Sequence, residues 1–314
     1  MGTLDLCLLL HAPRTGRLCL KQDSALIRCL VSLNPRGTRG ARIAVNCQLS
    51  TPMKQAFRVS RSLLVTYYAF MLEYRAELLL WALSGSLPFI LMGVWTQAAE
   101  QGDFGLSSVE FARYFLAVYL VRQLTVVWVI WDFEREIVDG KLSFRLLQPL
   151  DPVWHHVWSH IGERFARLPF IFGLVALFFL LYPSAFWLPS LGQMGLFTIA
   201  IACAFTLQFL IQYTLAMFAF WTEKASSIQE VLFLVSLFLS GAIAPLEIFP
   251  PEVRSLALWT PFPYIINFPA SILTGLKVDF VHNIGVMFVW GLVLAIVNRW
   301  LWKKGLRQYS GMGA

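Results

Sequence analysis

Six long windows that are poor in charge limit what this chain can fold into. A helix that crosses the hydrocarbon core of a membrane needs about 20 predominantly apolar residues. Sustained apolarity predicts crossing helices at residues 76–97, 111–132, 168–188, 193–221, 228–249 and 281–302. Because the third window has only a short clean apolar run and contains Pro183, we expect a kink or a frayed outer end there. The windows predict an all-α polytopic membrane protein.

The composition excludes an ordinary soluble domain. Hydrophobic residues make up 58% of the sequence and charged residues 14%, whereas soluble domains are about 45–50% apolar and about 25% charged. The net charge of +7 does not indicate a nucleic-acid partner, because the basic residues lie beside the apolar windows and not in one long run. Four of the five cysteines precede Met53, so neither a disulfide framework nor a metal site is indicated.

The basic residues near the ends of the windows predict the orientation. One side has fourteen: Lys54, Arg58, Arg61, Arg75, Arg135, Lys141, Arg145, Arg164, Arg167, Lys224, Arg299, Lys303, Lys304 and Arg307. The other side has three, Arg113, Arg254 and Lys277. Loops rich in Lys and Arg stay in the cytoplasm. This bias predicts six spans with both termini and the 133–167 loop in the cytoplasm.

Residues 1–52 differ from the rest of the chain. They contain scattered arginines and few acids, and no clean helical or strand period runs through them. We interpret them as a disordered tail, an organelle-targeting segment or an artefact of an upstream translation start. The transmembrane domain is predicted to be residues 53–314. Its first part, residues 53–75, has the pattern of an amphipathic helix that lies on the bilayer surface.

The loop after the second window mixes charged and apolar residues. Its apolar positions, Ile137, Leu142, Leu146 and Leu147, suit a short amphipathic helix that docks into a groove of a partner protein. Pro149 and Pro152 end that helix. A solvated connector with no partner is the alternative.

Two stretches of the sequence resemble a known family. The run Asp139-Gly-Lys-Leu-Ser-Phe-Arg-Leu-Leu-Gln-Pro-Leu-Asp-Pro152 is similar to a signature of bacterial ABC type-2 permeases, the membrane subunits of ABC exporters. The Pro-rich stretch at 240–250, with Pro261–Tyr264 and Pro269–Gly275 after it, also resembles that family. The resemblance covers the chain from about Met53 to the C-terminus.

The resemblance implies a permease that pairs with a second permease subunit, in a homodimer or a heterodimer, and with two ATPase subunits in the bacterial inner membrane. ATP and Mg²⁺ would bind to the ATPase, and this chain would hold no cofactor. Residues 137–150 would be the coupling helix, with Ile137, Asp139, Gly140, Lys141, Leu142, Arg145, Leu146, Leu147 and Pro149 at the ATPase. Residues 53–75 would be the connecting helix. Residues 250–275 would form an outer re-entrant element, which also fits six prolines between 245 and 269.

Arg122 lies near the middle of the second window. A central Arg costs about 2.5–3.5 kcal/mol on insertion, which the apolar residues around it offset. Such a residue faces a cavity or a partner helix. It could contact an anionic substrate in the transport pathway, or pair with Glu73, Glu77 or Glu230.

A periodic apolar stripe from Trp154 to Leu168 predicts a helix at the membrane surface that leads into the third span. Its other face carries His156, His160 and Glu163 at a spacing that could hold a metal. We predict no metal site, because wet faces of interfacial helices often carry these residues.

Enzyme motifs are missing from the sequence. It has no GxxxxGK[ST] phosphate loop, no GxSxG motif and no HExxH motif. The sequence therefore predicts a transport subunit that depends on a separate ATPase. The alternatives are an ATP-independent secondary transporter or channel and a membrane-embedded lipid-modifying enzyme, for which His155, His156 and His160 are the available cluster.

Overall fold

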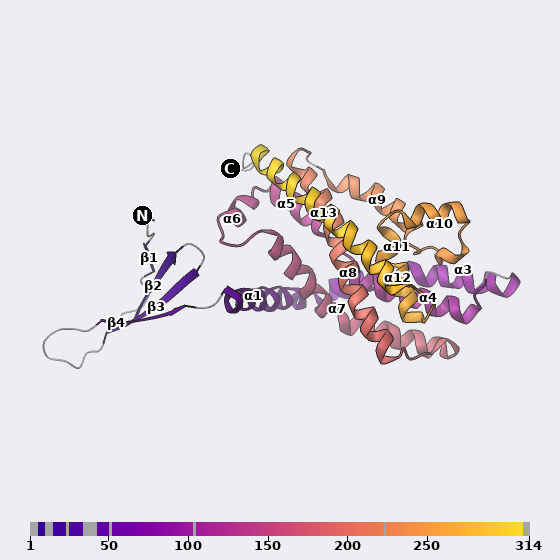
Figure 1. The fold of residues 1–314 in the computed structure, drawn as a ribbon. Coiled ribbons are helices and arrows are strands. Elements are labelled where there is room, and N and C mark those ends of the chain that lie inside the picture. Colours follow the sequence, from indigo (N-terminus) through magenta and orange to yellow (C-terminus); the bar gives the residue numbers. More distant parts are fainter. Residues whose placement is uncertain are drawn as a thin grey trace. The chain divides into compact units, whose positions relative to one another are not determined.

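The computed structural model describes residues 6–9, 15–22, 25–33, 43–49, 52–102, 105–222 and 224–309. The chain divides into two compact units, Met1–Thr66 and Tyr67–Ala314 (Figure 1).

The first unit contains a four-stranded antiparallel sheet. Its strands are β1 (Leu6–Leu9), β2 (Thr15–Gln22), β3 (Ala25–Leu33) and β4 (Ile43–Leu49), in the order β1-β2-β3-β4. The sequence analysis expected no regular element here. No single period runs through the whole segment, and the alternation that favours a strand is short, as in residues 45–49 of β4. The interpretation of residues 1–52 as a tail, a targeting segment or an artefact stays a prediction.

Helices follow the sheet. They are α1 (Pro52–Glu73), α2 (Arg75–Ser84), α3 (Leu87–Gln101), α4 (Ser108–Thr125), α5 (Val129–Val138), α6 (Leu142–Leu146), α7 (Val153–Leu181), α8 (Leu191–Ala216), α9 (Ser226–Leu239), α10 (Pro251–Leu258), α11 (Phe262–Ile265), α12 (Asn267–Thr274) and α13 (Phe280–Gln308). Short 3₁₀ turns are η1 (Pro183–Ala185), η2 (Met217–Phe220) and η3 (Leu246–Ile248). From Tyr67 onward every described regular element is helical. The all-α prediction for the membrane domain is confirmed.

Five helical segments of the second unit are long and apolar enough to cross a membrane. They are Arg75–Gln101, Ser108–Val138, Val153–Leu181, Leu191–Phe220 and Phe280–Gln308. They overlap the first, second, third, fourth and sixth predicted windows. The chain is an integral, multi-pass membrane protein.

The fifth predicted span, 228–249, is helical only as far as Leu239. Its helix α9 has 14 residues, about 21 Å at 1.5 Å per residue, against a hydrocarbon core of about 30 Å. Gly241 ends the helical path with a φ of 83°, and a Cβ there would lie 2.9 Å from the Cβ of Asn267. The apolar window did not reveal the end of the helix, because the residues after Gly241 remain apolar.

The third predicted span also differs from the structure. The stripe 154–168 is not a separate surface helix, because α7 is continuous from Val153 to Leu181 and passes through Pro169. The helix ends before Pro183, so the predicted extension to residue 188 is wrong. Pro183 cannot continue the helix, and η1 replaces it.

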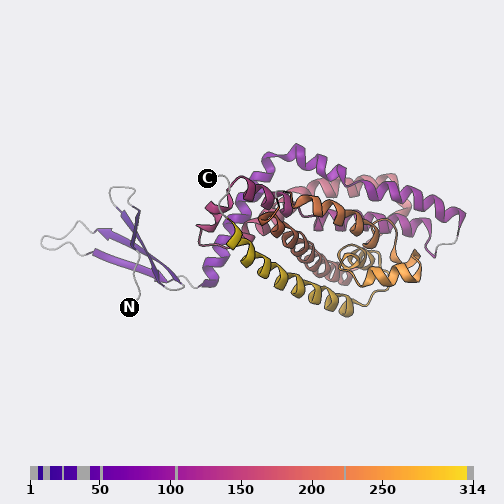
Figure 2. The ribbon, with the colours of Figure 1, turned by 90° about the horizontal axis from the view of Figure 1, so that it is seen from above.

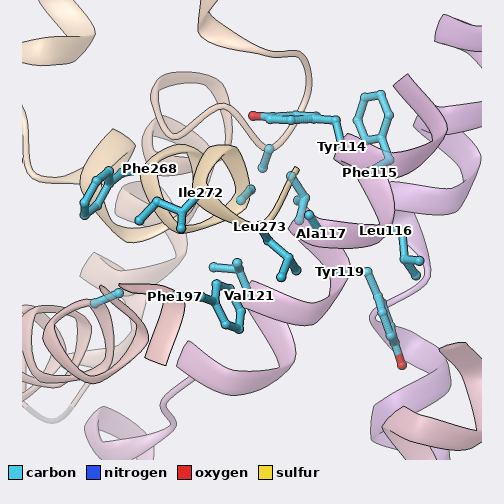
Figure 3. Packing of buried hydrophobic residues seen from close by; sticks show 14 of the residues in the cluster. Tyr114, Phe115, Leu116, Ala117, Tyr119, Val121, Phe197, Phe268, Ile272 and Leu273 are labelled. Atoms are coloured by element: carbon cyan, nitrogen blue, oxygen red, sulfur yellow. The ribbon is translucent and has the colours of Figure 1, made fainter. Parts of the chain in front are cut away.

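A core of buried apolar side chains surrounds α4. Figure 3 shows Tyr114, Phe115 and Tyr119 of α4 among side chains of neighbouring helices. Phe197 of α8 and Phe268, Ile272 and Leu273 of α12 supply the other side of this packing. A capping box of Ser107 and Glu110 starts α4, with the Ser107 amide donating to the Glu110 carboxylate at 2.8 Å. α4 is therefore fixed at its start and buried along its length.

The segment between α9 and α13 is broken and partly buried. α11 and α12 are buried, whereas α10 exposes Leu256 and the following Trp259 is 82% exposed. The Tyr114 hydroxyl reaches this segment, at 2.8 Å from the Gly241 carbonyl and 2.7 Å from Asn267 Oδ1. The Tyr264 hydroxyl donates to the Leu258 carbonyl at 3.0 Å. The predicted insertion of 250–275 into the membrane stays a prediction.

Candidate functional site

The second span is broken in the middle. α4 ends at Thr125, α5 begins at Val129, and the three residues between them are not helical. Backbone groups freed by a break within a membrane span must bond to other protein groups or to water in a cavity.

Side chains of α7 satisfy the broken backbone. The Arg164 guanidinium donates through Nε to the Leu124 carbonyl at 2.6 Å, and through Nη2 to the Val126 carbonyl. The Trp128 amide donates to Nε2 of His160 at 2.9 Å. His160 therefore carries its proton on Nδ1, which donates to the His156 carbonyl at 2.8 Å. Arg164 and His160 hold the break in place.

A cavity of about 530 Å³ lies beside the break. Its walls come from α4, residues 126–128, α5, α8, α9 and α11. Arg122, Gln208, Gln212, Gln229, Glu230, Ser236 and Ser240 are among its polar lining residues. Trp128, Trp131 and Phe233 are among its aromatic ones. Its volume is in the range of ligand pockets, about 300–1,000 Å³.

Arg122 makes no ion pair within the described part of the chain. Its Nη1 is buried and has no hydrogen-bond partner there. None of the three expected partners, Glu73, Glu77 and Glu230, forms an ion pair within 4.0 Å in the described residues. Glu77 accepts a hydrogen bond from Trp81 at 3.2 Å, and Glu230 lines the same cavity. The structure does not support pairing as the role of Arg122.

The loop after the second span forms a tight turn and a short helix. Gly140, with a φ of 69°, turns the chain after α5, a conformation that favours glycine. α6 then exposes apolar side chains. Phe144 is 72% exposed, and Leu147, the residue after the end of α6, is 84% exposed. Leu146 and Pro149 are also exposed. Lys141 and Asp139 form an exposed ion pair at 2.7 Å.

Two of the predicted coupling residues face inward. Ile137 is 3% exposed and Leu142 is fully buried, in a cluster with Phe133, Tyr213 and other residues of α8 and η2. They anchor the loop and cannot contact a partner in this arrangement. The sequence analysis did not name Phe144 among the coupling residues. α6 has only five residues, and the sequence of a single helical turn does not show which of its sides packs against the protein.

Ionic and polar contacts fasten the loop to the transmembrane helices. Arg145 pairs with Glu136 at 2.5 Å, and Nε2 of His156 lies 3.4 Å from the same carboxylate. Asp151 pairs with Arg299 of α13 at 2.8 Å. The Ser143 hydroxyl lies 3.0 Å from the Tyr309 hydroxyl. The α6 loop is therefore fastened to α7 and α13 as well as to α5.

The start of α9 is tied to the same loop. The carboxylate of Glu134 on α5 accepts from the Ser226 amide at 2.7 Å and from the Ser226 hydroxyl at 3.2 Å. This carboxylate satisfies free amides at a helix start and suits its partial positive charge. The carboxylate of Glu134 therefore links α5 and α9, two walls of the cavity.

The histidines proposed as an enzyme site have structural partners. His155 lies 3.1 Å from the Tyr67 hydroxyl and 2.9 Å from Gln148 Oε1. His160 bonds to the break and His156 lies beside Glu136. These contacts position backbone and loop.

Comparison with known proteins agrees with this architecture. The family model described as "ABC-2 family transporter protein" matches residues 80–313. No curated protein matches the chain. The match covers α4, the break, the cavity, the loop and α13, which is most of the chain. The chain therefore belongs to the ABC-2 transporter family and is a membrane permease component of an ABC transporter.

Proposed function

We propose that this permease works as an exporter of the bacterial inner membrane, that it pairs with a second permease subunit, and that separate ATPase subunits drive it through α6. ATP and Mg²⁺ bind to the ATPase in this proposal. The observation that carries it is the exposure of Phe144 and Leu147 on a loop that is otherwise firmly held. Large apolar side chains exposed outside the hydrocarbon region mark a contact with another protein.

The charges around these side chains favour a docking surface. The exposed Lys141 and Asp139 lie at one end of α6, and the neighbouring Arg145 is held by Glu136. An apolar centre with a polar rim is the usual anatomy of a protein interface. The predicted cytoplasmic position of the 133–167 loop places this surface where an ATPase would be.

The test is affinity purification from the native host in mild detergent. The wild-type chain should bring down a soluble subunit with a phosphate loop, and the double variant Phe144→Asp/Leu147→Asp should lose most of it. Leu188→Asp is the matched control, because Leu188 is 81% exposed and lies in the connection between η1 and α8. It should retain the subunit.

Two results would contradict coupling through α6. One is full recovery of the ATPase with the double variant. The other is an equal loss with Leu188→Asp, which would indicate general damage. Leu142→Asp is unsuitable as a test, because Leu142 is fully buried and a carboxylate there would disrupt packing.

A further inference from the structure

Four side chains that line the cavity beside the broken span each carry one buried polar atom that the chain itself does not satisfy. Within the described residues, Arg122 Nη1, Gln212 Oε1, Gln229 Oε1 and Ser240 Oγ are buried and have no hydrogen-bond partner. All four residues line the cavity. Gln212, Gln229 and Ser240 are 4%, 6% and 2% exposed.

Such a set is costly unless something binds to it. An unsatisfied buried polar group costs about 1–3 kcal/mol, and a charged one costs more. Four of them come from α4, α8, α9 and the residue after α9, and they share one hollow. Side chains from separate elements that converge on one cavity indicate a ligand, since each could otherwise turn to a local backbone partner.

The chemistry of these atoms defines the ligand. Arg122 offers a fixed positive charge that suits a phosphate, sulfate or carboxylate group. The glutamine amides and the Ser240 hydroxyl suit hydroxyl groups close to that anion. Trp128, Trp131 and Phe233 form apolar walls that suit hydrocarbon.

We propose that this cavity binds an amphiphile whose head group carries one anionic group next to hydroxyl groups, and that this amphiphile belongs to the transported class. Binding itself is independent of the ATPase. The assignment as transport substrate rests on the proposed function.

Glu230 limits the negative charge that the head group can carry. It lines the same cavity but is exposed, and it forms no ion pair within 4.0 Å in the described chain. A head group with two or more negative charges would be repelled by this carboxylate. A single anion is therefore preferred.

The test uses the purified full-length chain in a neutral detergent and short-chain lipids with identical tails. Phosphatidylglycerol carries one anion and two hydroxyls, phosphatidylcholine has no net charge, and phosphatidylethanol carries one anion but lacks the glycerol hydroxyls. Native mass spectrometry gives the dissociation constant of each. Wild type should bind phosphatidylglycerol about tenfold or more tightly than either of the others, as the loss of one charged hydrogen bond implies.

Variants separate the two parts of the head-group site. Arg122→Gln should reduce the preference over phosphatidylcholine and keep that over phosphatidylethanol, whereas Gln212→Leu should reduce the preference over phosphatidylethanol. Arg135→Gln is the matched control for charge, because Arg135 is exposed and does not line this cavity. It should keep both preferences.

Equal affinity of wild type for the three lipids overturns the proposal, and this comparison needs no variant to fold. An equal effect of Arg122→Gln and Arg135→Gln also overturns it, because the attraction would then be a general surface effect. Purification of the ATPase is a separate readout. If the wild-type chain brings down no ATPase but keeps its lipid preference, the coupling proposal fails and the binding site stands. If the wild-type chain brings down the ATPase but shows no lipid preference, the site fails and the coupling proposal stands.

Discussion

At the scale of single residues, Arg164 has the largest structural task outside the apolar core. Its guanidinium donates to carbonyls of Leu124, Val126 and His160, all of which lie around the break. The ring of Phe205 lies 4.2 Å from its Cζ, an arrangement that favours a cation further. A residue that looks like an orientation signal in the sequence is the main support of a discontinuous helix.

Replacing Arg164 with methionine should lower the free energy of unfolding by about 2 kcal/mol, because the freed carbonyls lose a charged donor inside the membrane. Thermal unfolding in detergent, followed by circular dichroism, would measure it. Arg135→Met removes an exposed arginine and should stay within about 0.5 kcal/mol of wild type. An Arg164→Met protein as stable as the control would show that the break does not depend on this side chain.

At the scale of elements, the last turns of α13 pack closely against η2. A Cβ on Gly305 would lie 2.1 Å from Cδ2 of Phe220, whose ring is buried. Phe220 also packs on Phe133 of α5, with ring centroids 5.6 Å apart. Glycine at this position lets α13 approach the cluster beneath the loop.

Gly305→Ala should destabilise the protein by about 1 kcal/mol, although alanine is the better helix former by about the same amount, because overpacking costs about 1–3 kcal/mol. Gly291→Ala on the same helix is the control. Its new Cβ would meet its nearest neighbour, Leu210 Cδ1, at 4.0 Å, so this variant should be neutral or more stable in the same unfolding assay. If both variants behave alike, the close approach is not rigid.

The elements could be predicted from the sequence where the signal was local, and not where it came from distant parts of the chain. Apolar length located α8 and α13, and prolines located the interruptions after α9. The break at 126–128 escaped prediction, because the groups that make it tolerable come from α7. The inward position of Leu142 escaped as well, since it depends on α8 and η2.

At the scale of the whole molecule, the number of crossings and the charge bias must agree. Five full-length crossings are an odd number, whereas two cytoplasmic termini require an even one. Within the second unit, Figures 1 and 2 place α6 and the end of α13 at one end and α10 at the other, with α9 leading between them. The short α9 and the irregular residues after it would together complete the sixth passage.

Cysteine labelling tests this topology. In a background without native cysteines, Ser255→Cys on α10 should react with a membrane-impermeant maleimide in intact cells. Lys141→Cys in the loop should react only after the membrane is permeabilised. Both positions are exposed, so access and not burial decides the outcome. Labelling of both from the same side would exclude the six-passage topology.

The break in the second span separates two helices with different surroundings. α4 is fixed in the core, whereas α5 is a separate rod of ten residues, about 15 Å long, whose far end carries the α6 loop. The three residues between them act as a joint beside the cavity. In the proposed function, a tilt of α6 turns α5 about that joint, and the ties of the loop to α7 and α13 and of α5 to α9 carry the movement to the walls of the cavity. The break is therefore the point at which the second span can bend while α4 stays packed in the core.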